Sequence, residues 1–152
     1  PDGTTINFRT EGGSIPGACQ TTDGGCSVTF VSQNPRPDDG RVTVLATATG
    51  EESFEDTNPS NGRFDAGEEF TDTREAFLDI DYDNARDPDE PYIDFNNNGQ
   101  YDLKSGTFNG LLCNADDECA ERNTIAVRDD LVIVLSGSSL FTSSAAAFTS
   151  VC

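Results

Sequence analysis

Residues 41–48 read "RVTVLATA", and this stretch decides the fold class. Its apolar side chains recur at every second position, which is the period of a β-strand that buries one face. The residues in phase are Val42, Val44, Ala46 and Ala48. Branched Val and Thr residues also favour strands over helices. The stretch therefore predicts a core β-strand.

Two segments nearer the N-terminus repeat this alternation. "TTINF" (4–8) places Ile6 and Phe8 on one face, and "CSVTFV" (26–31) does the same with Cys26, Val28 and Phe30. Clusters of Gly, Pro, Asn and Asp separate the segments and are typical of turns. The first fifty residues therefore predict an all-β protein built from short strands.

β-like sequence returns near the C-terminus. "LVIVL" (131–135) is an uninterrupted apolar run, which is typical of a strand buried on both faces or at the centre of the core. We expect the strands near 41–49 and 130–136 to be neighbours, with the intervening segment inserted between them. A long insertion of this kind is tolerated because the entropy of loop closure grows slowly with length.

Residues 1–50 resemble the bacterial immunoglobulin-like domains of invasin and intimin type. The likeness lies in "DGTTINFRTEGGSI", in "CQTTDGGCSVTFV" and in the late strand "RVTVLATATG". It implies a β-sandwich module of a large surface or secreted protein, acting as a spacer or an adhesive tip. Family members usually have a strand before the DGT segment, and this chain begins almost on that segment. The resemblance thus implies that the missing strand is absent, supplied by the C-terminal tail, or donated by a neighbouring subunit.

The predicted architecture is an immunoglobulin-like β-sandwich with a long calcium-binding loop insertion between two late strands. Residues 1–50 and 123–138 would form the sandwich, and residues 51–122 would form the acidic insertion with its disulfide loop. Residues 139–152 would be a tail or a linking strand. Since the sequence opens at Pro1 without Met, we expect a processed product or a segment of a longer protein.

The acidic residues are concentrated in one part of the chain. The net charge is −19, and residues 56–102 hold fourteen Asp or Glu, compared with five in residues 1–50. This charge argues against nucleic acid or an anionic membrane as a direct partner, and no membrane insertion is expected. Its local concentration points to a cation site. Without His, the commonest transition-metal ligand and the usual general base are both missing.

Five cysteines indicate an oxidising, extracellular or cell-surface location. Cys19 with Cys26, and Cys113 with Cys119, each close a short polar loop, and neither pair has the spacing of a zinc site. We therefore predict two local disulfides. Cys152 would then pair with another chain, pair with a residue beyond this segment, or stay unpaired.

Residues 79–90, "DIDYDNARDPDE", have the spacing of a calcium loop of the EF-hand type. Such a loop places side-chain oxygens at positions 1, 3, 5 and 9, a turn residue at 6, a backbone carbonyl at 7 and a bidentate Glu at 12. Here Asn84 would make the turn at position 6. The predicted ligands are Asp79, Asp81, Asp83, the carbonyl of Ala85, Asp87 and Glu90.

Two related copies flank this loop. One allows an inserted residue and predicts Asp56, Asn58, Asn61, Asp65 and Glu68 as ligands, with Gly62 at the turn. The other predicts Asp94, Asn96, Asn98, the carbonyl of Gln100, and Asp102, with Gly99 at the turn. Position 12 of this last loop is Ser105, so its bidentate ligand must come from elsewhere. A repeat of the form Glu-x-aromatic-x-Asp, at 68–72, 75–79 and 90–94, links the copies.

The competing interpretation is that Asp, Asn and Gly occur in any loop. Three copies within residues 56–102 favour calcium, and about two or three ions are expected. Mg²⁺ fits less well because it requires a tighter octahedron and retains its waters.

We do not expect an enzyme. Paired carboxylates can act in glycosidases, and the formal candidates are Glu51, Glu52, Asp116, Asp117 and Glu118. However, the chain has no Trp and only three Tyr to line a sugar cleft, and a Ser nucleophile would have no His partner.

The predicted function is that of a calcium-stabilised extracellular structural or adhesive module of a bacterial surface or secreted protein. Its partners would be adjacent modules or identical subunits, with a surface glycan or protein receptor as a further candidate. One alternative is a subunit of an extracellular filament or pilus assembled by strand donation. Another is a calcium-dependent carbohydrate-binding module.

Overall fold

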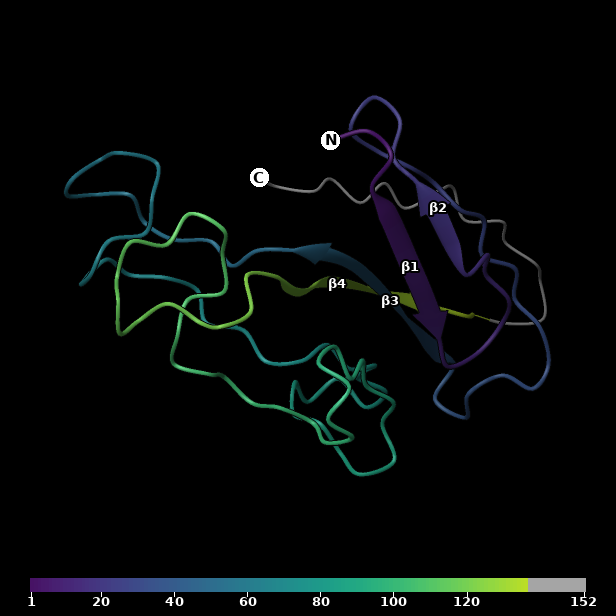
Figure 1. The fold of residues 1–152 in the computed structure, drawn as a ribbon. Helices are drawn as coiled ribbons and strands as arrows, with labels where there is room; N and C mark the ends of the chain where they lie inside the picture. Colours follow the sequence, from purple (N-terminus) through teal and green to yellow (C-terminus); the bar gives the residue numbers. More distant parts are fainter. Residues whose placement is uncertain (137–152) are drawn as a thin grey trace. The chain divides into compact units, whose positions relative to one another are not determined.

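The computed structural model describes residues 1–136 and contains a four-stranded antiparallel sheet with the order β2-β1-β3-β4 (Figure 1). The strands are β1 (Thr5–Thr10), β2 (Ala18–Gln20), β3 (Arg41–Gly50) and β4 (Ile125–Val134). No helix occurs among the described residues, and so none long and apolar enough to cross a membrane. The prediction of an all-β protein is confirmed.

Strand β3 is the centre of the sheet unit, as its alternating sequence predicted. It lies between β1 and β4, and its pairing with β1 is antiparallel, with Phe8 opposite Ala46. Val44 and Ala46 pack with Phe8 in a buried cluster on one face. On the other face Thr43 and Leu45 are also buried, each only 1% exposed. A strand buried on both faces is the most costly part of this unit to disrupt.

Residues 26–31 do not form the predicted strand. Only Val31 pairs, through an isolated bridge to Ser14, and the rest of the segment is irregular. Val28 and Phe30 nevertheless pack against the Phe8 cluster. The alternation therefore identified the side chains that are buried, but it could not indicate whether a partner strand was available for the backbone.

The prediction that residues 131–135 form a doubly buried strand is also wrong. β4 is the last strand in the sheet order, and its apolar residues Leu131, Val132 and Val134 are 37%, 38% and 68% exposed. Ile133 alone among residues 131–134 packs against the core cluster. Among the described residues β4 has one neighbouring strand, β3, so an edge position in the sheet accompanies this exposure.

The chain divides into two compact units. Among the described residues, the sheet unit comprises residues 1–48, 77–91 and 128–136, whereas the second unit comprises residues 49–76 and 92–127. The second unit has its own core of four phenylalanines, in which Phe64 stacks on Phe108 with ring centroids 4.6 Å apart. Phe54 and Phe70 meet both of these rings edge-on. Such aromatic pairs stabilise a core beyond their area of burial.

Both predicted disulfides are formed. Cys19 bonds to Cys26 in the sheet unit, and Cys113 bonds to Cys119 beside the phenylalanine core of the second unit. Residues 139–152, which were predicted as a tail or linking strand and include Cys152, lie outside the described residues. Within residues 1–136 the strands belong to a single sheet, so the immunoglobulin-like sandwich stays a prediction.

Candidate metal-binding loops

The carboxylate of Asp79 organises the first half of the loop 79–90. Its Oδ1 accepts a hydrogen bond from the backbone N–H of Tyr82 (2.7 Å), and its Oδ2 accepts one from Asn84 (2.9 Å). Asn84 occupies the predicted turn position and has a φ of 59°. This left-handed conformation is one that Asn tolerates better than most residues. The chain is thereby folded back around the carboxylate at position 1.

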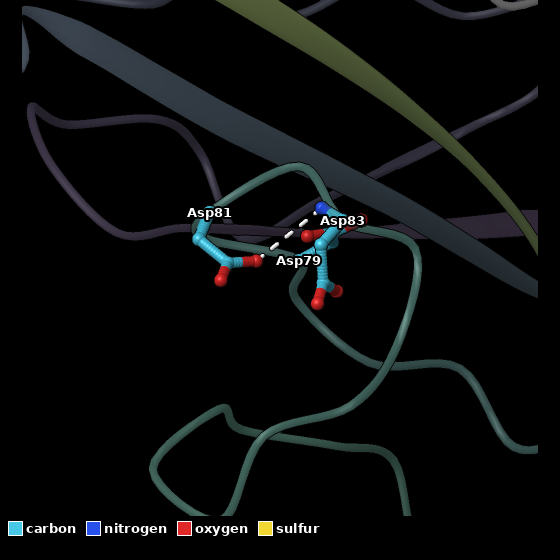
Figure 2. A group of neighbouring side chains, drawn as sticks. All are labelled: Asp79, Asp81 and Asp83. Carbon is cyan, nitrogen blue, oxygen red and sulfur yellow. Dashed lines mark hydrogen bonds between the residues drawn. The ribbon is translucent and has the colours of Figure 1, made fainter.

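Two further carboxylates converge with Asp79. Oxygens of Asp79, Asp81 and Asp83 all lie within 4.8 Å of one another (Figure 2). Asp81 accepts a hydrogen bond from the backbone N–H of Asp83, at 3.3 Å, and Asp83 accepts one from Ala85, at 2.6 Å. Desolvation raises the pKa of Asp81 above its ordinary value of 3.8, and the negative charges of Asp83, Asp87 and Glu90 raise it further. The loop thus concentrates negative charge at one point.

Glu90 closes this loop from its far end. Its side chain is only 3% exposed, and its two carboxylate oxygens accept hydrogen bonds from Ile80 N–H (2.5 Å) and from Asp87 N–H (3.0 Å). One carboxylate therefore ties together positions 2, 9 and 12 of the loop. Burial of a charged group is unfavourable unless it is paired or hydrogen-bonded, and these two bonds meet that requirement.

The loop 56–68 follows the same scheme. Asp56 accepts hydrogen bonds from the N–H groups of Asn61 (2.9 Å) and Gly62 (2.8 Å), and Gly62 has a φ of 75°. Glu68, which is 7% exposed, accepts from Thr57, Asn58 and Asp65. Asn61 also donates its side-chain amide to Asp65.

The loop 94–102 also follows this scheme, with its closing glutamate supplied from elsewhere in the chain. Asp94 accepts from the N–H groups of Asn98 (3.0 Å) and Gly99 (2.8 Å), and Gln100 donates its N–H to Asn98. Asn96 and Asn98 both donate side-chain amides to Asp102.

Glu75 performs for this loop the role that Glu90 performs for the loop 79–90. Its Oε1 accepts from Phe95 N–H (2.8 Å) and its Oε2 accepts from Asp102 N–H (3.1 Å). The sequence indicated that this ligand was missing from position 12, but it did not identify Glu75, because that residue precedes the loop.

A fourth arrangement of this kind is discontinuous in sequence. Asp72 accepts from the N–H groups of Ser105 and Gly106, and Gly106 has a φ of 75°. Glu52, which is 5% exposed, accepts from Thr73 N–H and from Asn109 N–H. The sequence did not predict this arrangement, because residues 72–73 and residues 105–109 are separated by the loops 79–90 and 94–102. It also has fewer carboxylates than the loop 79–90.

The four closing glutamates share a local sequence that explains their placement. Each begins a Glu-x-aromatic-x-Asp segment, and the fourth copy, "ESFED" at 52–56, was not among the predicted repeats. The segments 52–56 and 68–72 pair antiparallel at Phe54 and Phe70. Glu52 accepts a backbone hydrogen bond in the arrangement that contains Asp72, and Glu68 accepts one in the loop that begins at Asp56. The aromatic residues of this pair lie in the core of the second unit, so the loop ends are anchored by burial.

The loop 79–90 is attached to the sheet through Thr43. The side-chain hydroxyl of Thr43 donates to the backbone carbonyl of Asp79 (2.8 Å), and its N–H donates to Glu11 (2.7 Å). Burial raises the pKa of Glu11, with the charges of Asp39 and Glu90 adding to the effect, while the bond from Thr43 opposes it. The position of Asp79 is therefore fixed by a buried residue of the central strand.

These loops bring together the oxygen ligands that hard cations require. Carboxylate, amide and carbonyl oxygens suit Ca²⁺ and Mg²⁺, and the loops contain no nitrogen or sulfur ligand typical of transition metals. Among the predicted ligands, the structure groups the carboxylates of Asp79, Asp81 and Asp83, while Glu68 and Glu90 bond to backbone N–H groups of their own loops.

The chain matches no protein-family model, no curated protein and no solved structure. The resemblance of residues 1–50 to invasin- and intimin-type domains therefore stays a prediction.

Proposed function

We propose that the chain is a calcium-stabilised structural or adhesive module of an extracellular protein of bacterial origin. The observation that carries the proposal is the shared construction of the loops 56–68, 79–90 and 94–102. Each has an Asp at its first position that accepts two backbone N–H groups, a left-handed turn residue and a closing glutamate. Three repetitions of one hydrogen-bonding scheme are not expected of loops that are merely polar.

The spacing of the carboxylates is compatible with a bound divalent cation such as calcium. Two ligands on opposite sides of one Ca²⁺ ion, each at about 2.4 Å, lie about 4.8 Å apart. The oxygens of Asp79, Asp81 and Asp83 are within that separation. Like charges held this close repel each other, and a bound cation removes the repulsion. The loop 79–90 has the most carboxylates of the three and is expected to bind most tightly, since affinity rises with ligand charge.

The attachment of the loop 79–90 to the sheet supports a structural role. A cation that fixes Asp79 also fixes its hydrogen bond to Thr43 in the central strand β3. Binding to the folded form alone stabilises that form, by an amount that grows with the free ion concentration. The two disulfides and the millimolar calcium outside cells fit an extracellular location.

The free edge of β4 favours one second candidate, a subunit completed by strand addition. Among the described residues β4 pairs on one side only, and Leu131, Val132 and Val134 are exposed there. An added strand would cover these side chains and satisfy the backbone of that edge. A complex that persists on size-exclusion chromatography at low concentration supports this candidate, whereas a monomer under all conditions contradicts it.

The main proposal is tested by thermal melting of the full chain in Ca²⁺, in Mg²⁺ and in EDTA. We expect the melting temperature to rise with Ca²⁺ concentration and to respond less to Mg²⁺. A variant with Asp79→Ala should lose part of this rise, whereas Asp116→Ala, at a position outside the loops, should keep it. Identical melting curves in Ca²⁺ and EDTA would contradict the proposal.

A further inference from the structure

Two of the loops contain an Asn-Gly sequence at the turn. These are Asn61-Gly62 and Asn98-Gly99, and all four residues are exposed to solvent. Asn-Gly is the sequence most prone to spontaneous deamidation, because glycine has no Cβ to hinder attack by its own nitrogen. In that reaction the glycine N bonds to the asparagine Cγ and the Cγ–Nδ2 bond breaks. Ammonia leaves with the proton of the glycine N–H, and water then opens the cyclic imide to aspartate or isoaspartate.

In both loops the reacting glycine nitrogen is held by a carboxylate. Gly62 N–H donates to Asp56 Oδ2 at 2.8 Å, and Gly99 N–H donates to Asp94 Oδ2, also at 2.8 Å. A negative charge at this distance opposes loss of the N–H proton, which the attack requires. The hydrogen bond also directs the nitrogen toward the aspartate.

The asparagine side chains are held as well. Asn98 accepts from Gln100 N–H through Oδ1 (2.7 Å) and donates through Nδ2 to Asp102 (2.8 Å). Asn61 makes the equivalent pair of bonds to Arg63 and Asp65, both at 2.8 Å. Each carboxamide therefore has both polar atoms bonded to residues that follow the glycine, and attack requires these bonds to break.

We propose that Asn61 and Asn98 are deamidation sites that the closed loops protect, so that modification occurs when a loop opens. The product changes the loop in one of two ways. Aspartate at position 98 adds a carboxylate where the loop 79–90 has Asp83, whereas isoaspartate lengthens the backbone by one carbon and disrupts the turn. Dependence of the reaction on calcium rests on the proposed function, but protection by Asp56 and Asp94 does not.

The chain provides an internal comparison at Asn109-Gly110. Asn109 is 8% exposed and donates its side-chain amide to the carbonyl of Arg122 (2.7 Å). Gly110 is buried too. This pair is part of the interior of the second unit, so it should react only when that unit unfolds.

The test is incubation of the full chain at mildly alkaline pH, followed by peptide mass spectrometry that separates asparagine, aspartate and isoaspartate. Asp94→Asn should accelerate deamidation at Asn98 by about tenfold or more while leaving Asn61 unchanged, and Asp56→Asn should do the reverse. A tenfold change corresponds to about 1.4 kcal/mol of lost protection. Asp89→Asn, an exposed substitution outside both Asn-Gly turns, should change neither rate.

The incubation is repeated in Ca²⁺, in EDTA and in denaturant. Denaturant should accelerate all three sites, and EDTA should accelerate Asn61 and Asn98 but not Asn109. Unchanged deamidation at Asn98 in Asp94→Asn, or equal acceleration of both loop sites by either variant, would overturn the proposal. If each variant accelerates deamidation only at its own site, but the rates in Ca²⁺ and EDTA are equal, protection by Asp56 and Asp94 is supported. The same result contradicts the proposed calcium binding.

Discussion

Replacement of Glu90 by Gln is the sharpest perturbation of the loop 79–90. The glutamate is 3% exposed and accepts hydrogen bonds from Ile80 N–H and Asp87 N–H, one on each carboxylate oxygen. Glutamine has the same shape, but its amide group has only one acceptor oxygen. One backbone N–H then loses its acceptor and faces the amide N–H₂ group. The remaining hydrogen bond is no longer charge-assisted and is therefore weaker.

The magnitude follows from these two bonds. A hydrogen bond to a charged group contributes about 1.5–3 kcal/mol, and leaving a buried donor unsatisfied costs about 1–3 kcal/mol. Since the two contributions overlap, we expect a loss of about 2–4 kcal/mol in the free energy of unfolding. For a chain of this size, that corresponds to a melting temperature lowered by roughly 4–16 °C. Calcium affinity should fall as well if Glu90 is the bidentate ligand that the loop spacing predicts.

The assay is thermal melting with and without Ca²⁺, and the matched control is Glu69→Gln. Glu69 is exposed, and its side chain is not among the predicted ligands. We expect the control to melt close to the unmodified chain and to retain its response to Ca²⁺. If Glu90→Gln and Glu69→Gln melt at the same temperature in EDTA, the two hydrogen bonds to Glu90 do not stabilise the loop.

Three further predictions concern the other loops, the carboxylates and the disulfides. Glu75→Gln should weaken calcium binding at the loop 94–102 while leaving the loop 79–90 intact, and calorimetry should then detect about one fewer ion; an unchanged ion count would contradict the role of Glu75. In EDTA, the contributions of Asp81 and Glu11 to the stability of the chain should increase as the pH falls from neutral toward the carboxyl range. The pKa values of Asp81 and Glu11 are raised in the folded form, so the folded form binds these two protons more tightly than the unfolded form does. Proton binding at the two carboxyl groups therefore stabilises the fold at low pH, and this contribution is lost as the pH rises through the folded pKa. The trend is measured as the difference in melting temperature between the unmodified chain and Asp81→Asn. Saturating Ca²⁺ should remove it, and a difference that stays constant over the same pH interval in EDTA would refute it. Replacing Cys113 and Cys119 together by Ser should cost about 2 kcal/mol, the entropy expected for a short closed loop, as measured by chemical denaturation; equal stability with and without the bond would refute this estimate.

The sequence predicted the parts of the fold that depend on local pattern. The alternation of residues 41–48 identified the central strand β3, and the short cysteine spacings identified both disulfides. The alternation in residues 26–31 is equally regular, yet the segment is not a strand, because strand formation also needs a partner backbone. The exposure of Val134 depends on the place of β4 in the sheet order, which local pattern does not encode.

The closing glutamates of the loops were likewise predicted only in part. Glu68 and Glu90 were predicted because each follows its own loop, Glu90 at position 12 and Glu68 one residue later. Glu75 was not, because it closes a loop that opens at Asp94, farther along the chain. The overlooked segment 52–56 carried a usable signal, since it has the same Glu-x-aromatic-x-Asp pattern as the other three copies. A search for that spacing would have identified Glu52 as a fourth closing residue.

Calcium binding by the three loops can be measured by calorimetric titration of the metal-stripped chain with Ca²⁺. We expect saturable binding of about two or three ions, with the tightest site lost in Asp79→Ala and retained in Asp116→Ala. The absence of saturable binding at millimolar Ca²⁺, or binding that neither variant changes, would contradict it.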